Sequence, residues 1–204
     1  AVDLDRLASP NLDAARVQAR ARWDAPRLSL DRLDAHLHAG QLLLTGRVDA
    51  VTRQIALQAE SSIDVHRVAP LLSESGRRWL RQYGFQTPPL ISGQAVATWP
   101  SWTRRSPDWR TEILPHLQLE GDVRARNGDF RRVPYSDAAV HFFLSNGVWR
   151  VPMLYATRPE GRLDLTYECP IATQDYHWGI RSTIDPRALR PILSPAQQRA
   201  LDFF

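Results

Sequence analysis

The side chains best suited to chemistry in this sequence are its histidines and its single cysteine. The histidines are His36, His38, His66, His116, His141 and His177. None of them has the spacing of a metal-binding motif or of a catalytic triad. His36-x-His38 would place two imidazoles on one face of a strand, where they could bind a metal. Because they alternate with Leu33, Ala35 and Leu37, we expect two solvated side chains and no metal site.

Cys169 offers no better case for catalysis. It precedes Pro170 and lies on the apolar side of an alternating segment, which favours a buried, unreactive thiol. The sequence contains no glycine-rich phosphate loop, no His-Glu-x-x-His zinc motif and no nucleophile elbow. We therefore predict a protein that is not an enzyme and needs no cofactor.

All 26 basic residues are arginine, and the formal net charge is +4. This composition has two explanations: the codon bias of a GC-rich genome, or selection for guanidinium groups that bind phosphate on lipid headgroups or nucleic acid. The arginines are scattered rather than grouped, which argues against nucleic acid as a partner.

Neither a signal peptide nor a transmembrane helix is visible in the sequence. Residues 1–6 lead into no apolar run, and the longest charge-free segment, 82–103, contains polar residues and prolines. The chain begins without Met and within an alternating pattern, so we expect a piece excised from a longer protein.

A repeat with an offset of 121 residues organises the chain. Residues 61–73 read Ser-Ser-Ile-Asp-Val-His-Arg-Val-Ala-Pro-Leu-Leu-Ser, and residues 182–194 read Ser-Thr-Ile-Asp-Pro-Arg-Ala-Leu-Arg-Pro-Ile-Leu-Ser. The same offset pairs Leu33 with Leu154, Ala35 with Ala156, Gly40 with Gly161, Leu42 with Leu163 and Leu44 with Leu165. We infer that one unit is written twice.

The first unit is predicted to be a meander of amphipathic strands, because apolar and polar residues alternate along it. The expected strands cover 15–23, 28–37, 41–48 and 54–62, with a turn at Ala39-Gly40. The apolar phase slips by one residue between Leu30 and Leu33, which predicts a β-bulge near Asp31 or Arg32.

The second unit shows the same alternation, with strands expected over 138–144, 149–155, 163–169 and 176–180. Asn146-Gly147 predicts a two-residue hairpin turn between the first two. The apolar face of the returning strand is expected to consist of Trp149, Val151, Met153 and Tyr155.

Each meander is predicted to end in two short helices. The expected N-caps are Asp64 and Ser73 in the first unit and Asp185 and Ser194 in the second. Pro70 and Pro191 would end or kink the first helix of each pair, and Gly84 would end the second helix of the first unit.

The units are joined by residues 84–135, where we expect a strand over 90–98, a Trp-rich loop, a strand over 116–126 and a hairpin turn at Asn127-Gly128. The chain is thus divided into 1–83, 84–135 and 136–204, all in one continuous sheet. The predicted fold class is mainly β with short helices: tandem antiparallel meanders that form a curved, groove-like sheet.

The connecting loop combines tryptophans with arginines. The residues concerned are Trp99, Trp102, Arg104, Arg105 and Trp109. Such a group is typical of a membrane interface or of a surface that binds a protein partner. The alternative is that the rings cap the open end of the sheet.

The repeated segment Ser-x-Ile-Asp-x-x-x-x-x-Pro-[Leu/Ile]-Leu-Ser and the strand opening Gly-x-Leu-x-Leu-Thr at Gly40 and Gly161 give the chain a family resemblance. It resembles the AsmA-like proteins of Gram-negative envelopes, relatives of TamB and of the repeating β-groove lipid-transfer proteins. The resemblance covers nearly the whole chain, through strand alternation and helix caps rather than catalytic motifs. It implies a curved sheet whose apolar concave face carries acyl chains between membranes.

The resemblance also implies a periplasmic location, an inner-membrane anchor in a segment not present here, and a role in outer-membrane biogenesis. Phospholipid or another acyl lipid would be the ligand, with envelope proteins as further partners. The groove lining would be Ile55, Leu57, Val140, Phe142, Leu163, Leu165, Tyr167, Tyr176, Trp178 and Ile180. The sequence departs from the family in two respects: it lacks the N-terminal anchor, and each unit carries helices that could fill the groove. The alternative is a structural or protein-binding β module in which aromatic residues such as Tyr155 and Tyr167 form an ordinary core.

Overall fold

The protein is a single curved sheet. A computed structural model describes residues 2–4, 7–9, 12–37, 40–193, 195 and 198–199, with side chains from residue 15 onward. The strands are β1 (Val2–Leu4), β2 (Leu7–Ser9), β3 (Leu12–Asp24), β4 (Arg27–Leu37), β5 (Gly40–Asp49), β6 (Gln54–Ser61), β7 (Tyr83–Phe85), β8 (Leu90–Thr98), β9 (Gln118–Phe130), β10 (Val133–Ser145), β11 (Val148–Arg158), β12 (Gly161–Pro170) and β13 (His177–Ser182).

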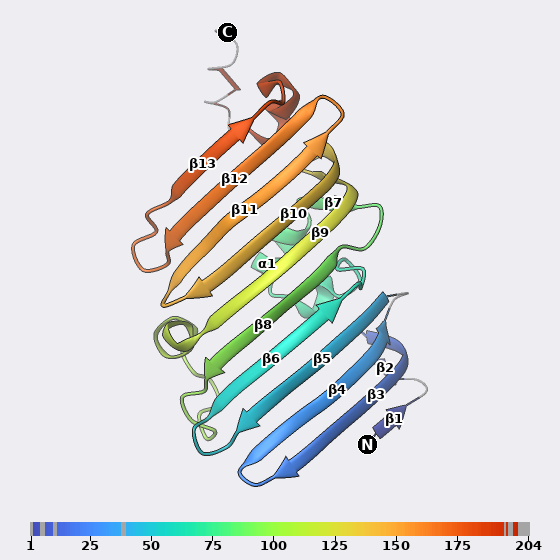
Figure 1. Ribbon diagram of the computed structural model, residues 1–204, viewed down its shortest axis with the longest axis vertical. Coiled ribbons are helices and arrows are strands. Elements are labelled where there is room, and N and C mark those ends of the chain that lie inside the picture. The colour runs from blue at the N-terminus through green and yellow to red at the C-terminus, as the bar shows by residue number, and fades with distance from the viewer. Residues whose placement is uncertain are drawn as a thin grey trace.

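All thirteen strands belong to one antiparallel sheet (Figure 1). Its main path runs β1-β3-β4-β5-β6-β8-β9-β10-β11-β12-β13, while β2 pairs with β3 and β7 pairs with β9. Among the described residues β1 and β13 lie at opposite edges, so the sheet is open rather than closed. The prediction of a mainly β, curved antiparallel sheet is confirmed.

The register sorts the side chains onto two contrasting faces. Paired residues of neighbouring strands point to the same side of a sheet. One row crosses from β3 to β13 through Val17, Ala35, Leu42, Ser61, Ile91, Val123, Val140, Leu154, Leu165 and Ile180. The next row, on the opposite side, runs through Gln18, Asp34, Leu43, Glu60, Ser92, Asp122, His141 and Met153. We call the first side the apolar face and the second the polar face.

The bulge predicted in the first unit is confirmed. Arg20 pairs with Arg32 whereas Ala21 pairs with Leu30, so Asp31 has no partner of its own on β3. Because of this extra residue in β4, the apolar side chains before and after the bulge lie on the same face of the sheet.

A second bulge, in β11, overturns the prediction for that strand. On β12, Tyr167 and Leu165 are two residues apart, but their partners Val151 and Leu154 are three apart. Pro152 lies in this interval, where a missing N–H costs no ladder bond. Met153 and Tyr155 consequently lie on the polar face, and only the Trp149–Val151 part of the predicted alternation is correct.

Two predicted hairpin turns have opposite outcomes. Asn146 and Gly147 form the β10–β11 turn with φ of 52° and 68°, as expected for an Asn-Gly pair. Asn127-Gly128 lies inside β9 instead, and the chain reverses at residues 131–132 with φ of 48° and 67°. The strand continues because β7 pairs with this part of β9. A Cβ on Gly128 would lie 2.5 Å from the carbonyl oxygen of Gly84, so glycine is required there for close approach.

The helices are shorter than predicted. They are η1 (Ala69–Leu71), α1 (Glu74–Leu80), η2 (Trp109–Ile113), η3 (Leu114–His116) and η4 (Pro186–Ile192). Ser73 caps α1, its Oγ accepting a hydrogen bond from the Gly76 N–H at 3.2 Å, as predicted. The predicted end at Gly84 is wrong, because α1 ends at Leu80 and Gly84 belongs to β7.

Asp64 starts a turn followed by the single 3-10 turn η1, not a helix, because Pro70 cannot donate a helical hydrogen bond. Asp185 does cap η4 by accepting a hydrogen bond from the Arg187 N–H at 2.9 Å. The second helix expected from Ser194 falls largely outside the described residues.

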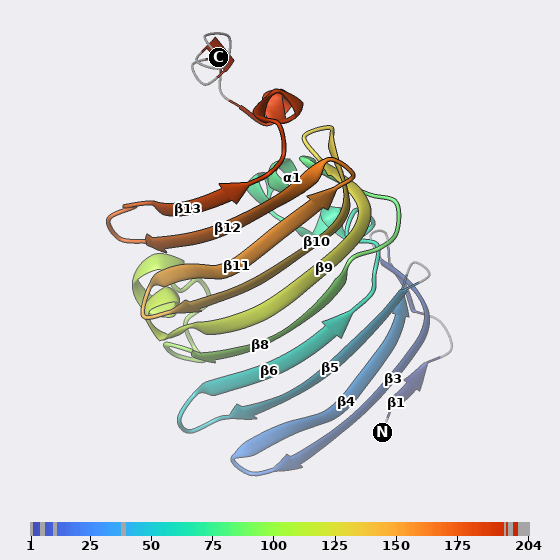
Figure 2. The same ribbon diagram turned by 45° about the horizontal axis from the view of Figure 1, so that its top comes forward.

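The strands bend along their length, and α1 lies on the inside of the bend (Figure 2). The segment that leads from β6 toward α1 packs onto the apolar face, where Ile63 joins Ala35 and Leu37 in a buried cluster and Val68 packs against it. The apolar face therefore lies on the inside of the bend, and this segment covers one part of it.

Candidate functional site

The sheet brings the predicted groove-lining residues together on the apolar face. All of them except Tyr176 occupy apolar-face positions in the register of β6, β10, β12 and β13. Tyr176 precedes β13, and its ring stacks against that of Tyr167 with centroids 6.2 Å apart. Residues predicted from separate parts of the chain thus form one surface.

None of these residues is fully buried. Leu57, Trp178 and Ile180 are 40%, 58% and 62% exposed, and the other strand residues of the set are half-buried. The same face contains buried residues, among them Leu144, Val151 and Cys169. Packing therefore fixes the side chains in place without removing the face from solvent.

Aromatic side chains are concentrated at the end of the apolar face formed by β10 to β13. Phe142 stacks on Trp149 with ring centroids 5.2 Å apart, and Tyr167 packs against Trp178 at 4.3 Å. Gly121 makes room for the first pair, because a Cβ there would lie 2.8 Å from Cζ of Phe142. Burial, together with a hydrogen bond to Cys169, raises the pKa of Tyr167 to about 12.

Two exposed apolar residues extend the surface at the other edge and were not among the predicted lining. Trp23 pairs with Leu28 across β3 and β4, and both lie exposed on the apolar face. The signal was available in the sequence, because Trp23 ends the alternating series that begins at Val17.

The polar face carries ion pairs between arginines and carboxylates. Arg32 Nη2 lies 2.6 Å from Asp34 Oδ2, and Arg162 Nη2 lies 2.7 Å from Asp164 Oδ1. The hydrogen bond from Gln41, reinforced by Arg32, lowers the pKa of the Asp34 carboxyl. These pairs neutralise part of the arginine charge on the polar face.

The histidines provide no metal-binding cluster within the described residues. His36 lies on the polar face as expected, with its Nε2 3.7 Å from Asp34 Oδ1, whereas His38 lies outside the described residues. His141 Nδ1 lies 3.2 Å from Asp122 Oδ1 on the same face.

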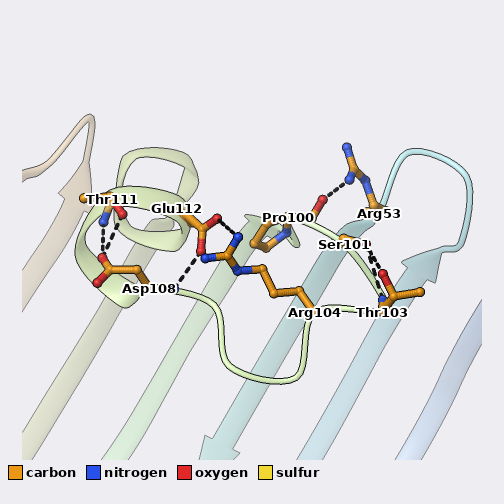
Figure 3. Close-up of polar contacts among 8 residues, drawn as sticks. All are labelled: Arg53, Pro100, Ser101, Thr103, Arg104, Asp108, Thr111 and Glu112. Atoms are coloured by element: carbon orange, nitrogen blue, oxygen red, sulfur yellow. Dashed lines mark hydrogen bonds and ion pairs between the residues drawn. The ribbon is translucent and has the colours of Figure 1, made fainter.

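The Trp-rich loop is tied to the β5–β6 turn. The Trp102 indole N–H donates to the Ala50 carbonyl oxygen at 2.9 Å, and the Arg53 guanidinium donates to the carbonyl oxygen of Pro100. Within the loop, Arg104 Nη1 lies 3.0 Å from Glu112 Oε1 (Figure 3). These contacts hold the loop at the side of the sheet.

Both interpretations of the tryptophans have structural support. Trp99 is half-buried, and its backbone N–H donates to the Arg53 carbonyl oxygen at 2.9 Å, as a cap on the sheet would. Trp102, Trp109 and Arg105 are exposed, as a contact surface would require. The loop thus combines an anchoring tryptophan with accessible ones.

Comparison with known proteins finds no matching family model, no matching curated protein and no matching solved structure. In the described part of the chain, no helix has both the length and the apolar character needed to span a bilayer.

Proposed function

We propose that this chain is a segment of a bacterial cell-envelope protein of the AsmA-like kind, which binds or conducts phospholipid along its apolar face. The observation that carries the proposal is the row of side chains from Val17 to Ile180, apolar except for Ser61, on the inside of a bent sheet. A periplasmic location, with membrane attachment through a segment outside this chain, completes the proposal.

The physical basis is the transfer of acyl chains from water to an apolar surface. Each buried CH₂ group contributes about 0.8 kcal/mol, without specific polar contacts. Half-exposed side chains such as Leu57 and Leu165 leave a lipid tail room to lie across the strands. Because the surface continues from strand to strand, a tail could move from one strand to the next along its exposed parts.

We also propose that the chain consists of two tandem units, each a meander followed by a helical segment. The bounds of β10, β11 and β12 equal those of β3, β4 and β5 displaced by 121 residues, since 133 − 12, 148 − 27 and 161 − 40 each give 121. The bulges at 30–33 and 151–154 show the same displacement. Duplication of a groove unit would lengthen the lipid path while preserving its cross-section.

A structural or protein-binding module without a ligand is the second candidate. The buried cluster of Ala35, Leu37 and Ile63 favours it, because there the chain's own segment covers the apolar face. The two candidates differ in whether lipid occupies the parts of the face that remain exposed.

Photo-crosslinking at adjacent residues tests the proposal. A photoreactive amino acid would replace Leu57 or Leu165 on the apolar face, and Gln58 or Asp164 on the polar face as matched controls on the same strands. The protein is expressed in a Gram-negative host, irradiated and examined by mass spectrometry. We expect lipid adducts at the two leucine positions only. Equal labelling of both faces, or no adduct at either, would contradict lipid binding and favour the ligand-free module.

A further inference from the structure

Strand β13 presents an unpaired edge. Among the described residues it pairs only with β12, and all its residues from His177 to Ser182 are exposed. The backbone N–H and C=O groups on its outer side therefore face solvent. Such an edge is a template for another strand unless proline, charged side chains or a bulge protect it. β13 has no proline and no bulge against β12, and its one arginine, Arg181, pairs in register with Asp164 on the polar face.

Backbone alternation identifies the outward-facing groups. The Thr183 N–H donates to the Arg162 carbonyl oxygen of β12 at 2.9 Å, so the backbone N–H and C=O groups of residue 183 point toward β12. Because successive residues of a strand point to opposite neighbours, Ser182, Ile180 and Trp178 direct their N–H and C=O groups outward.

The equivalent edge of β6 shows what such an edge accepts. The Ser62 N–H donates to the Gln41 carbonyl oxygen at 2.9 Å, which is the same inward contact 121 residues earlier. On its outer side β6 pairs antiparallel with β8 over its full length, from Gln54 to Ser61. The occupied edge of β6 is therefore a guide to the unpaired edge of β13.

The side chains of β8 define the pattern that would fit. Leu57 pairs with Ala95 and Ala59 pairs with Gly93, and the β13 residues at the corresponding places are Trp178 and Ile180. Small residues on the new strand, opposite Trp178 and Ile180, would leave room for these two large side chains on the apolar face.

We propose that β13 is the acceptor edge for one further antiparallel strand, supplied by a partner segment with the side-chain pattern of β8. That pattern is small apolar residues on one side, alternating with uncharged polar residues such as Ser92 and Gln94 on the other. Addition of a strand to an exposed edge is an established mode of peptide recognition, in which backbone hydrogen bonds supply affinity. This interface does not depend on lipid binding.

The test uses a fluorescent peptide with the sequence of residues 88–99 and the whole chain. Binding is measured by fluorescence anisotropy, and amide hydrogen exchange locates it. We expect protection of the Trp178, Ile180 and Ser182 amides on peptide addition. Ile180→Pro removes an outward N–H without a β12 bond and should weaken binding at least tenfold, whereas Ile180→Ala keeps the N–H and should bind within about threefold of wild type. Unchanged exchange across the β12–β13 pair shows that Ile180→Pro is folded.

N-methylated peptides supply a second control. Methylation at the position of Gly93, whose N–H would face β13, should abolish binding, while methylation at Gln94 should not. Equal binding of both peptides, or undiminished binding to Ile180→Pro, would overturn the proposal. Protection of the β13 amides that rises with protein concentration in the absence of peptide would also overturn it, because the occupant would then be a second copy of this chain.

Discussion

The indole of Trp178 packs against the phenol of Tyr167, with ring centroids 4.3 Å apart, across the last strand pair of the sheet. The contact joins a half-buried residue of β12 to an exposed residue of the edge strand β13. The contact therefore helps to hold β13 on the sheet, since among the described residues this strand has backbone hydrogen bonds to a neighbouring strand on one side only.

Trp178→Ala should lower the free energy of unfolding by about 1 kcal/mol, the value of an aromatic pair beyond its area burial. Urea denaturation followed by circular dichroism measures the change. Ile180→Ala is the matched control, because Ile180 is an aliphatic residue of the same strand and face and is similarly exposed. A Trp178→Ala protein as stable as the control would show that the ring contact contributes nothing to the edge.

Stability should decline in alkali between pH 10 and about 12. Burial raises the pKa of Tyr167 and of Tyr135 to about 12, from an ordinary value of 10. The unfolded chain therefore ionises first, so that stability is complete below pH 10 and falls as pH rises toward 12. Tyrosinate absorbance should show these two phenols titrating late, and Tyr135→Phe should flatten the decline. Titration of all five tyrosines near pH 10 in the folded protein would contradict the assignment.

Arg132→Gly should stabilise the protein by about 1 kcal/mol, because Arg132 holds a φ of 67° that side chains other than glycine adopt at a cost. Its backbone N–H, which donates to Asp129 Oδ1 at 3.0 Å, is retained. The thermal midpoint and urea midpoint should both rise. Gly147→Ala, at a φ of 68° in the next hairpin, should lower them, and a change of the same sign in both variants would contradict this account.

Gly121→Ala should destabilise the fold by about 1–3 kcal/mol, because the new methyl group would lie 2.8 Å from Cζ of Phe142 and 3.0 Å from the Ser92 carbonyl oxygen. Phe142→Leu in the same chain should recover part of the loss by removing the first of these contacts. A double-mutant cycle in urea measures the coupling. Additive effects would show that the ring moves aside freely.

Alternation and its interruptions made much of the fold predictable. The slip between Leu30 and Leu33 is visible in the sequence and marks a real bulge. In β11 the phase slip is concealed, because Met153 and Tyr155 are themselves apolar and continue the alternation past the bulge. Pro152 was the remaining signal, since proline within a sheet belongs at an edge or a bulge.

Tertiary pairing decided the features that local sequence predicted wrongly. Asn127-Gly128 has the composition of a turn, but the nonlocal partner β7 keeps β9 extended through it. The actual turn, Arg131-Arg132, has neither asparagine nor glycine and relies on contacts elsewhere: the Arg131 N–H donates to the Gln82 carbonyl oxygen at 2.7 Å. The predicted groove lining depended only on alternation and register, and its placement on one face followed.

Cys169, the chain's only thiol, lies buried on the apolar face, paired in register with Trp149. Because the thiol is shielded, its reactivity in the native protein reports local opening of the structure around it. A small thiol reagent can reach the sulfur only while the groups that cover it move away, so the labelling rate relative to that of a free thiol measures the free energy of this local opening. Because β12 carries Leu163, Leu165 and Tyr167 of the proposed lipid path, the same rate would show whether a bound tail tightens this part of the sheet.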